Sequence, residues 1–117
     1  MNKVKFNEKH KEILDSFLLG IPIVNPGKMY GYPAYYVGGK LFASLYNDSV
    51  CVKIPKTRVK DFLIKEGIVP FEPMGRRMSE WILIIRENSK DYQKDCDIFE
   101  ESIEFVSSLA NIKMKKK

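Results

Sequence analysis

The chain has few of the residues that build metal sites and disulfide frameworks. It contains two cysteines and a single histidine in 117 residues. Cys51, Cys96 and His10 are too far apart in sequence to form the closely spaced ligand pairs of a zinc site. The sequence therefore predicts no metal, no cofactor and two reduced thiols. Both thiols fall at apolar-periodic positions, which favours burial. His10 lies on or beside an apolar stripe, where we expect a packed or half-exposed histidine and not a catalytic one.

Long hydrophobic runs are also missing. No segment approaches the roughly 18 apolar residues of a membrane-spanning helix. The N-terminal segment MNKVKFNEKHKEIL interleaves charged and apolar side chains, unlike a secretion signal. We therefore expect a cytoplasmic protein that does not insert into membranes. The chain is long enough for one core, so residues 1–112 are expected to form one domain, followed by a basic tail at residues 113–117.

The positive charge is concentrated in that tail. The formal net charge is +5, and residues 113–117 contribute four lysines, whose removal leaves +1 for the rest of the chain. A nearly neutral body favours a solvated tail over a dedicated nucleic-acid arm. A nucleic-acid partner stays possible but is not favoured.

Apolar residues recur at helical spacing in three segments. The first predicts a helix near residues 7–19, which Asn7 can cap and Gly20 can end. A second, short helix follows Pro55, with Gly67 as its stop. The third is expected to begin at Ser89 as its cap. The side of this helix that lies opposite the apolar stripe is acidic. We expect that side to be a solvated face without catalytic or metal-binding carboxylates. It carries Asp95, Asp97, Glu100, Glu101 and Glu104.

Alternating apolar residues predict an antiparallel sheet. Residues 22–32 contain two prolines and two glycines and are expected to be a loop. A strand at about 34–37 is joined by the Gly38–Gly39 turn to a second strand, which places Val37 opposite Lys40, Tyr36 opposite Leu41 and Tyr35 opposite Phe42. Alternation then assigns Ala34, Tyr36, Leu41, Ala43 and Leu45 to one face, and Tyr35, Val37, Phe42 and Tyr46 to the other.

Three further strands complete the predicted sheet. Val50, Val52 and Ile54 alternate in a third strand after the turn at residues 47–49. Residues 71–74 and 78–85 are predicted to pair around Gly75-Arg76-Arg77. The expected fold class is α+β, in the order α-β(3)-α-β(2)-α, with an antiparallel sheet covered by helices on at least one face.

Several short motifs resemble the N-terminal domain family of the TfoX competence regulator. They are MYGYP at residues 29–33, GKLFA at 39–43, KIP at 53–55 and PMGR at 73–76, followed by Met78 and Trp81. The resemblance covers residues 29–86. It implies a secretion-chaperone-like, YjbR-like fold, whose members commonly pair as homodimers. It also implies a stand-alone domain without the C-terminal helical domain of the longer regulators, and it supplies no established reaction.

Two groups of residues are candidate sites. The candidate binding patch consists of Tyr30, Tyr32, Lys53, Arg76, Arg77 and Trp81. Its rings and loop residues are also suited to packing, and its cations to surface solvation. The candidate dimer face consists of Tyr35, Val37, Phe42 and Tyr46. If the helices cover the opposite face, these apolar side chains need another cover, and a symmetric homodimer would supply it.

The residues favour a binding role over catalysis. The single histidine has no local motif that supports a nucleophile, so no hydrolase is indicated. The leading hypothesis is a non-enzymatic dimeric regulatory or interaction module of the TfoX N-terminal type with a possible protein partner. The first alternative is nucleic-acid binding through Arg76, Arg77 and the lysine tail. The second is binding of a small anionic ligand near Lys53.

Overall fold

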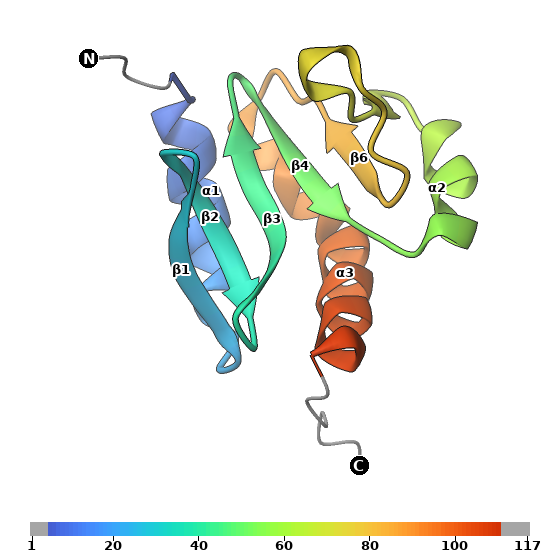
Figure 1. Ribbon diagram of the computed structural model, residues 1–117. Coiled ribbons are helices and arrows are strands. Elements are labelled where there is room, and N and C mark those ends of the chain that lie inside the picture. The colour runs from blue at the N-terminus through green and yellow to red at the C-terminus, as the bar shows by residue number, and fades with distance from the viewer. Residues whose placement is uncertain (1–4, 111–117) are drawn as a thin grey trace.

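The computed structural model describes residues 5–110, which form one antiparallel sheet and a layer of helices (Figure 1). The helices are α1 (Glu8–Leu18), α2 (Lys56–Leu63) and α3 (Cys96–Leu109), with short 3-10 helices η1 (Pro73–Gly75) and η2 (Ser89–Asp95). The strands are β1 (Val24–Met29), β2 (Tyr32–Val37), β3 (Lys40–Tyr46), β4 (Ser49–Lys53), β5 (Ile68–Pro70) and β6 (Trp81–Ile84). They lie in the order β1-β2-β3-β4-β6-β5. The α+β class is confirmed.

Strand β1 was not expected, because its segment was predicted to be a loop. It forms the edge of the sheet, where Pro26 can lack an N–H because no strand lies beyond it. Gly27 leaves room for the ring of Tyr36, which would lie 2.8 Å from an added Cβ. The Tyr36 hydroxyl also donates to the carbonyl of Lys28 at 2.6 Å. A neighbouring aromatic side chain therefore holds a strand whose own sequence is typical of a loop.

A β-bulge changes the predicted register of the central hairpin. Val37 opposite Lys40 and Tyr36 opposite Leu41 are confirmed, but Tyr35 pairs with Ala43 and not with Phe42. The extra residue in β3 moves the later side chains of that strand to the other face of the sheet. Ala43 and Leu45 therefore share the face of Tyr35 and Val37, whereas Tyr46 points to the opposite face.

The predicted strand pair at residues 71–74 and 78–85 is also wrong. The observed pair is β5 with β6, in which Ile68 lies opposite Ile84. Residues 71–80 form a connection that contains η1, where Met74 has a φ of 55° and Gly75 a φ of 78°. Positive φ values at consecutive residues are incompatible with an extended strand. Arg76 and Arg77 consequently lie in a long connection and not at a tight hairpin tip.

The three α-helices cover one face of the sheet (Figure 1). The Tyr35 hydroxyl donates to Asp15 of α1 at 2.6 Å, and the Ser102 hydroxyl of α3 donates to the carbonyl of Phe42 at 3.2 Å. Arg58 of α2 makes a hydrogen bond of 2.7 Å to Glu101 of α3. Within residues 5–110, no helix has the length and apolar character needed to cross a bilayer.

The caps differ partly from expectation. Asn7 caps α1 as predicted, and its side chain accepts from the backbone N–H groups of Lys9 and His10. The last helical segment is capped by Asn88, which accepts from the N–H of Lys90, so the prediction of Ser89 as the cap is wrong. The second helix ends at Leu63, before the predicted stop at Gly67. The Ser89 hydroxyl instead contacts His10, at 2.6 Å from Nδ1.

Candidate interaction face

The sheet face opposite the helices, called here the open face, carries a row of aromatic rings. Tyr32 of β2 and Tyr46 of β3 have ring centroids 5.3 Å apart, and Tyr46 meets Phe71 edge-on at 5.0 Å. Phe71 in turn lies 6.1 Å from Trp81 of β6. These four residues are the aromatic row. Phe71 is buried, while the other three rings are partly exposed, so the row presents apolar surface to solvent.

Lys53 lies beside this row, and its ammonium group already interacts with the Trp81 ring and the Glu80 carboxylate. Register places it directly opposite Trp81, and its ammonium group lies 5.6 Å from the centroid of the Trp81 ring. The same ammonium group is 3.3 Å from a carboxylate oxygen of Glu80. An anionic ligand would have to compete with that carboxylate, so this geometry is unfavourable for an anion site at Lys53.

The two arginines of the candidate patch differ in their surroundings. Arg77 lines a shallow cavity of about 290 Å³ together with Lys53 and Trp81, and its guanidinium lies 3.8 Å from Glu72. Arg76 is exposed, and no ion-pair partner reaches its side chain within residues 5–110. Tyr30 is 90% exposed at the β1–β2 turn. The structure therefore brings Tyr32, Lys53, Arg77 and Trp81 to the open face or its rim.

The candidate dimer face is not an exposed surface of the sheet. Tyr35, Val37 and Phe42 are each at most 1% exposed and belong to the core beneath the helices. The argument for a dimer through these side chains assumed that the helices cover the opposite face, but the helices pack on the face that carries Tyr35 and Val37. Only Tyr46 of the four lies on the open face. A charged residue at Phe42 would test the stability of the core and not an interface.

Sequence reasoning missed Phe71 and Leu83 as parts of the open face. Both were assigned to a predicted strand pair that does not form. Leu83 lies opposite Cys51 and is partly exposed, whereas Phe71 reaches the face from the connection after β5. The sequence gives no clear signal for β1, because Tyr30 adopts a positive φ in the β1–β2 turn, where asparagine, aspartate or glycine is the usual residue.

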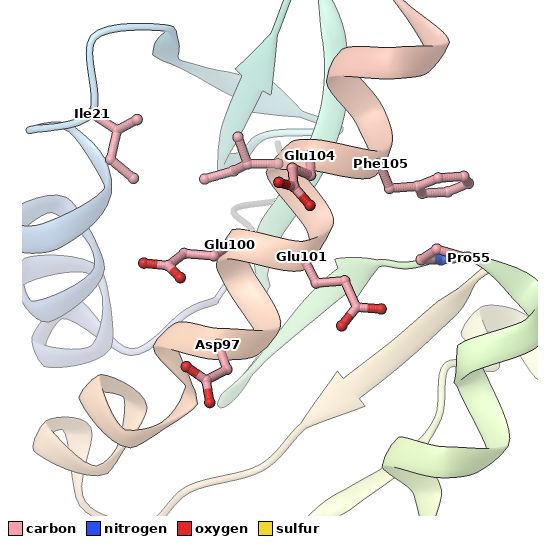
Figure 2. A pocket seen from close by; sticks show the side chains of 8 residues that line it. Ile21, Pro55, Asp97, Glu100, Glu101, Glu104 and Phe105 are labelled. Carbon is pink, nitrogen blue, oxygen red and sulfur yellow. The ribbon is translucent and has the colours of Figure 1, made fainter. Parts of the chain in front are cut away.

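The acidic side of α3 lines an open groove in the helix layer. Figure 2 shows Asp97, Glu100, Glu101 and Glu104 along the helix, between Ile21 and Pro55. Asp97, Glu100 and Glu104 are exposed as predicted, and Glu101 is neutralised by the Arg58 guanidinium. The prediction is wrong for Asp95, which is buried and paired with Arg86. Within residues 5–110, no group of three or more His, Cys, Asp or Glu side chains has a geometry that could hold a metal ion.

Neither cysteine is placed for thiolate chemistry. Both are free, and Cys51 is fully buried on β4. Burial raises the pKa of the Cys51 thiol to about 12. Cys96 is only partly buried, contrary to expectation, and its pKa is raised by burial and then by Glu100, Asp97 and Asp95. Both groups therefore stay protonated thiols at neutral pH.

No protein-family model matches the chain, and no curated protein or solved structure matches it either. The architecture and the contacts described above are therefore the basis for any functional argument.

Proposed function

We propose that this protein is an interaction module that binds a protein partner, in the first place a second copy of itself, through the open face. The observation that carries the proposal is the aromatic row on the sheet face opposite the α-helices, where three of the four rings are partly exposed. A symmetric dimer buries the same patch on both subunits, so one apolar face is sufficient to form it. The resemblance to the TfoX N-terminal family supports a regulatory setting for this binding.

The composition of the open face supports a binding surface. Tyrosine, tryptophan, methionine and arginine are enriched at protein interfaces, where they combine apolar area with polar tips. Tyr32, Tyr46 and Trp81 occupy the face, and Arg77 lies at its rim beside the row. Met74 in the neighbouring connection is fully exposed. Lys53 and Glu80 supply a charged pair at the edge, where polar contacts fix the register of a partner.

The proposal is tested by the molar mass in solution. Light scattering after gel filtration, over a range of concentrations, should give the mass of a dimer for the native chain. Tyr32→Asp should shift the mass to that of a monomer, because it places a charge within the aromatic row. Leu19→Asp is the matched control, since Leu19 is 38% exposed at the end of α1 in the helix layer.

Circular dichroism must show that both variants remain folded. A native chain that is a monomer at every concentration would contradict the homodimer. A dimer that Tyr32→Asp leaves intact would place the interface elsewhere.

A second candidate function is binding of single-stranded nucleic acid on the same face. The specific observation is that the partly exposed Trp81 ring lines the same cavity as Arg77, and stacking rings with adjacent cations bind single strands. Fluorescence anisotropy with labelled single-stranded and duplex DNA would test it, using the full chain and a 1–112 truncation at low and physiological salt. Binding lost on truncation or at physiological salt would leave only electrostatic attraction to the tail.

A further inference from the structure

Three segments that are distant in sequence bring a serine, a histidine and an aspartate together. His10 projects from α1, Ser89 is the first residue of η2, and Asp48 lies in the β3–β4 turn. The Nδ1 atom of His10 is 2.6 Å from the Ser89 hydroxyl oxygen. The other ring nitrogen, Nε2, is 3.6 Å from a carboxylate oxygen of Asp48. The imidazole therefore stands between a hydroxyl and a carboxylate.

The surroundings of His10 favour one arrangement of its proton. A proton on Nε2 faces the Asp48 carboxylate, and Nδ1 is then an acceptor for the Ser89 hydroxyl. His10 is fully buried, and Nε2 has no partner within hydrogen-bond distance. The Asp48 side chain is 83% exposed, and its Oδ1 accepts a hydrogen bond of 2.9 Å from the side chain of Asn7. The Tyr92 ring packs edge-on against the imidazole at 4.8 Å.

Ser89 can be reached from outside, although His10 is buried. Ser89 is partly exposed and lines an open cavity of about 670 Å³ between α1 and the start of η2. Two cations, Lys9 and Lys90, and two carboxylates, Glu12 and Glu87, line the same cavity. Cationic side chains near a nucleophile can stabilise an oxyanion that forms when the nucleophile attacks a carbonyl group. The site thus places an accessible hydroxyl in the cavity and a buried base directly behind it.

We propose that Ser89, His10 and Asp48 form a nucleophile–base–carboxylate site that hydrolyses small activated esters. The Ser89 oxygen attacks the ester carbonyl while its proton passes to Nδ1 of His10. The tetrahedral intermediate collapses, its C–O bond breaks, and the leaving alcohol takes the proton from His10. Water then attacks the acyl-serine with His10 as base, which releases the carboxylic acid and restores the Ser89 hydroxyl.

In this site Nδ1 of the imidazole faces the serine and Nε2 faces the aspartate. The serine-protease triad has the reverse arrangement, in which serine contacts Nε2 and aspartate contacts Nδ1. Either nitrogen of a neutral imidazole can accept a proton while the other carries one. Such sites are recognised by geometry and roles and not by sequence order. Asp48 does not touch the reacting atoms, so it is a positioning residue whose carboxylate faces Nε2 of the imidazole.

The first test is labelling of the intact chain with a fluorophosphonate probe. The Ser89 oxygen forms a bond to phosphorus, fluoride leaves, and the serine proton departs by way of His10. Mass spectrometry of peptides should find the probe on Ser89 in the folded protein and not in the chain unfolded by urea. Ser16→Ala is the matched control, because Ser16 is an exposed serine on α1 whose hydroxyl contacts only the carbonyl of Ile13.

Substitutions then separate the roles of the three residues. His10→Asn keeps a hydrogen-bonding group near the position of Nδ1 but cannot accept the proton, so labelling should slow by about 100-fold or more. Asp48→Asn should lower the rate constant of labelling without changing the probe concentration that gives half saturation. A purely structural role for Asp48 would instead change the thermal midpoint and leave that rate constant unaltered.

Absence of probe on Ser89 in the folded native chain would overturn the proposal. Labelling of folded His10→Asn at the native rate would also overturn it. If His10→Asn does not fold, the Ser89→Cys variant tests the proposal instead. We expect its introduced thiol to react with iodoacetamide faster than Cys96 does, because His10 can accept the proton of that thiol. An introduced thiol that reacts no faster than Cys96 would reject the site. None of these outcomes depends on the oligomeric state that the interaction proposal concerns.

Discussion

The ion pair between Arg86 and Asp95 is expected to be a major contributor to stability. Two guanidinium nitrogens of Arg86 donate to the two carboxylate oxygens of Asp95, at 2.9 and 2.7 Å. The third donates to the carbonyl of Glu66 at 2.7 Å. The side chains are 19% and 6% exposed. The pair joins the end of β6, the turn before β5 and the end of η2, so its loss affects three segments at once.

Asp95→Asn removes the charge but keeps the shape of the side chain. Removal of one partner from a buried pair costs about 3–5 kcal/mol, because the other charge is left without compensation. The partial exposure of Arg86 and its remaining bond to Glu66 lower that value, and we expect a loss of about 2–3 kcal/mol. For a chain of this length, such a loss corresponds to a decrease of roughly 10 °C in the thermal midpoint.

Urea unfolding followed by circular dichroism measures this loss. Asp91→Asn is the matched control, because Asp91 pairs with Lys94 at 3.6 Å through side chains that are 43% and 81% exposed. The control should change the free energy of unfolding by less than about 0.5 kcal/mol. If Asp95→Asn costs no more than its control, water already compensates the Arg86 charge and the argument from burial is wrong.

Three further outcomes follow from other contacts. Cys51 should resist alkylation in the folded chain at pH 8 and react after urea unfolding, because burial raises its pKa to about 12. Burial also raises the pKa values of Tyr35 and Tyr92, so the unfolded chain releases these two protons at a lower pH than the folded chain does. The free energy of unfolding should therefore fall as pH rises above about 10, which urea unfolding at pH 9 and pH 11 measures. Gly27→Ala should cost about 1 kcal/mol in urea unfolding, because the added Cβ displaces the Tyr36 ring.

Much of the helix layer could be predicted because the signals are local. The apolar stripe of α1 and its Asn7 cap lie within one element, and the predicted helix at residues 7–19 agrees closely with Glu8–Leu18. The Gly38–Gly39 turn likewise fixed the first two pairs of the central hairpin. Errors began where a neighbouring element overrides local preference. Tyr36 supports β1 in spite of Pro26 and Gly27, which in isolation indicate a loop.

The candidate site was only partly predictable for the same reason. Tyr32, Lys53 and Trp81 were predicted as candidate binding residues from their positions in a loop and two strands, and they do meet the open face. Phe71, which connects Tyr46 to Trp81, was placed in a strand that does not form. The assignment of the later β3 side chains to the two faces failed because one bulge reversed the alternation of that strand, and a bulge carries no residue signature as clear as a glycine turn.

The sequence by itself determined the class of the fold, the amphipathic helices and the tight hairpin turn, because hydrophobic period and turn residues act over a few positions. Only the tertiary structure decided which sheet face the helices cover, since alternation distinguishes two faces without saying which one meets the helices. It also decided that His10 meets Ser89, 79 residues further along the chain. Contacts over such a separation depend on how whole helices and strands pack together, and a local sequence pattern does not predict that packing.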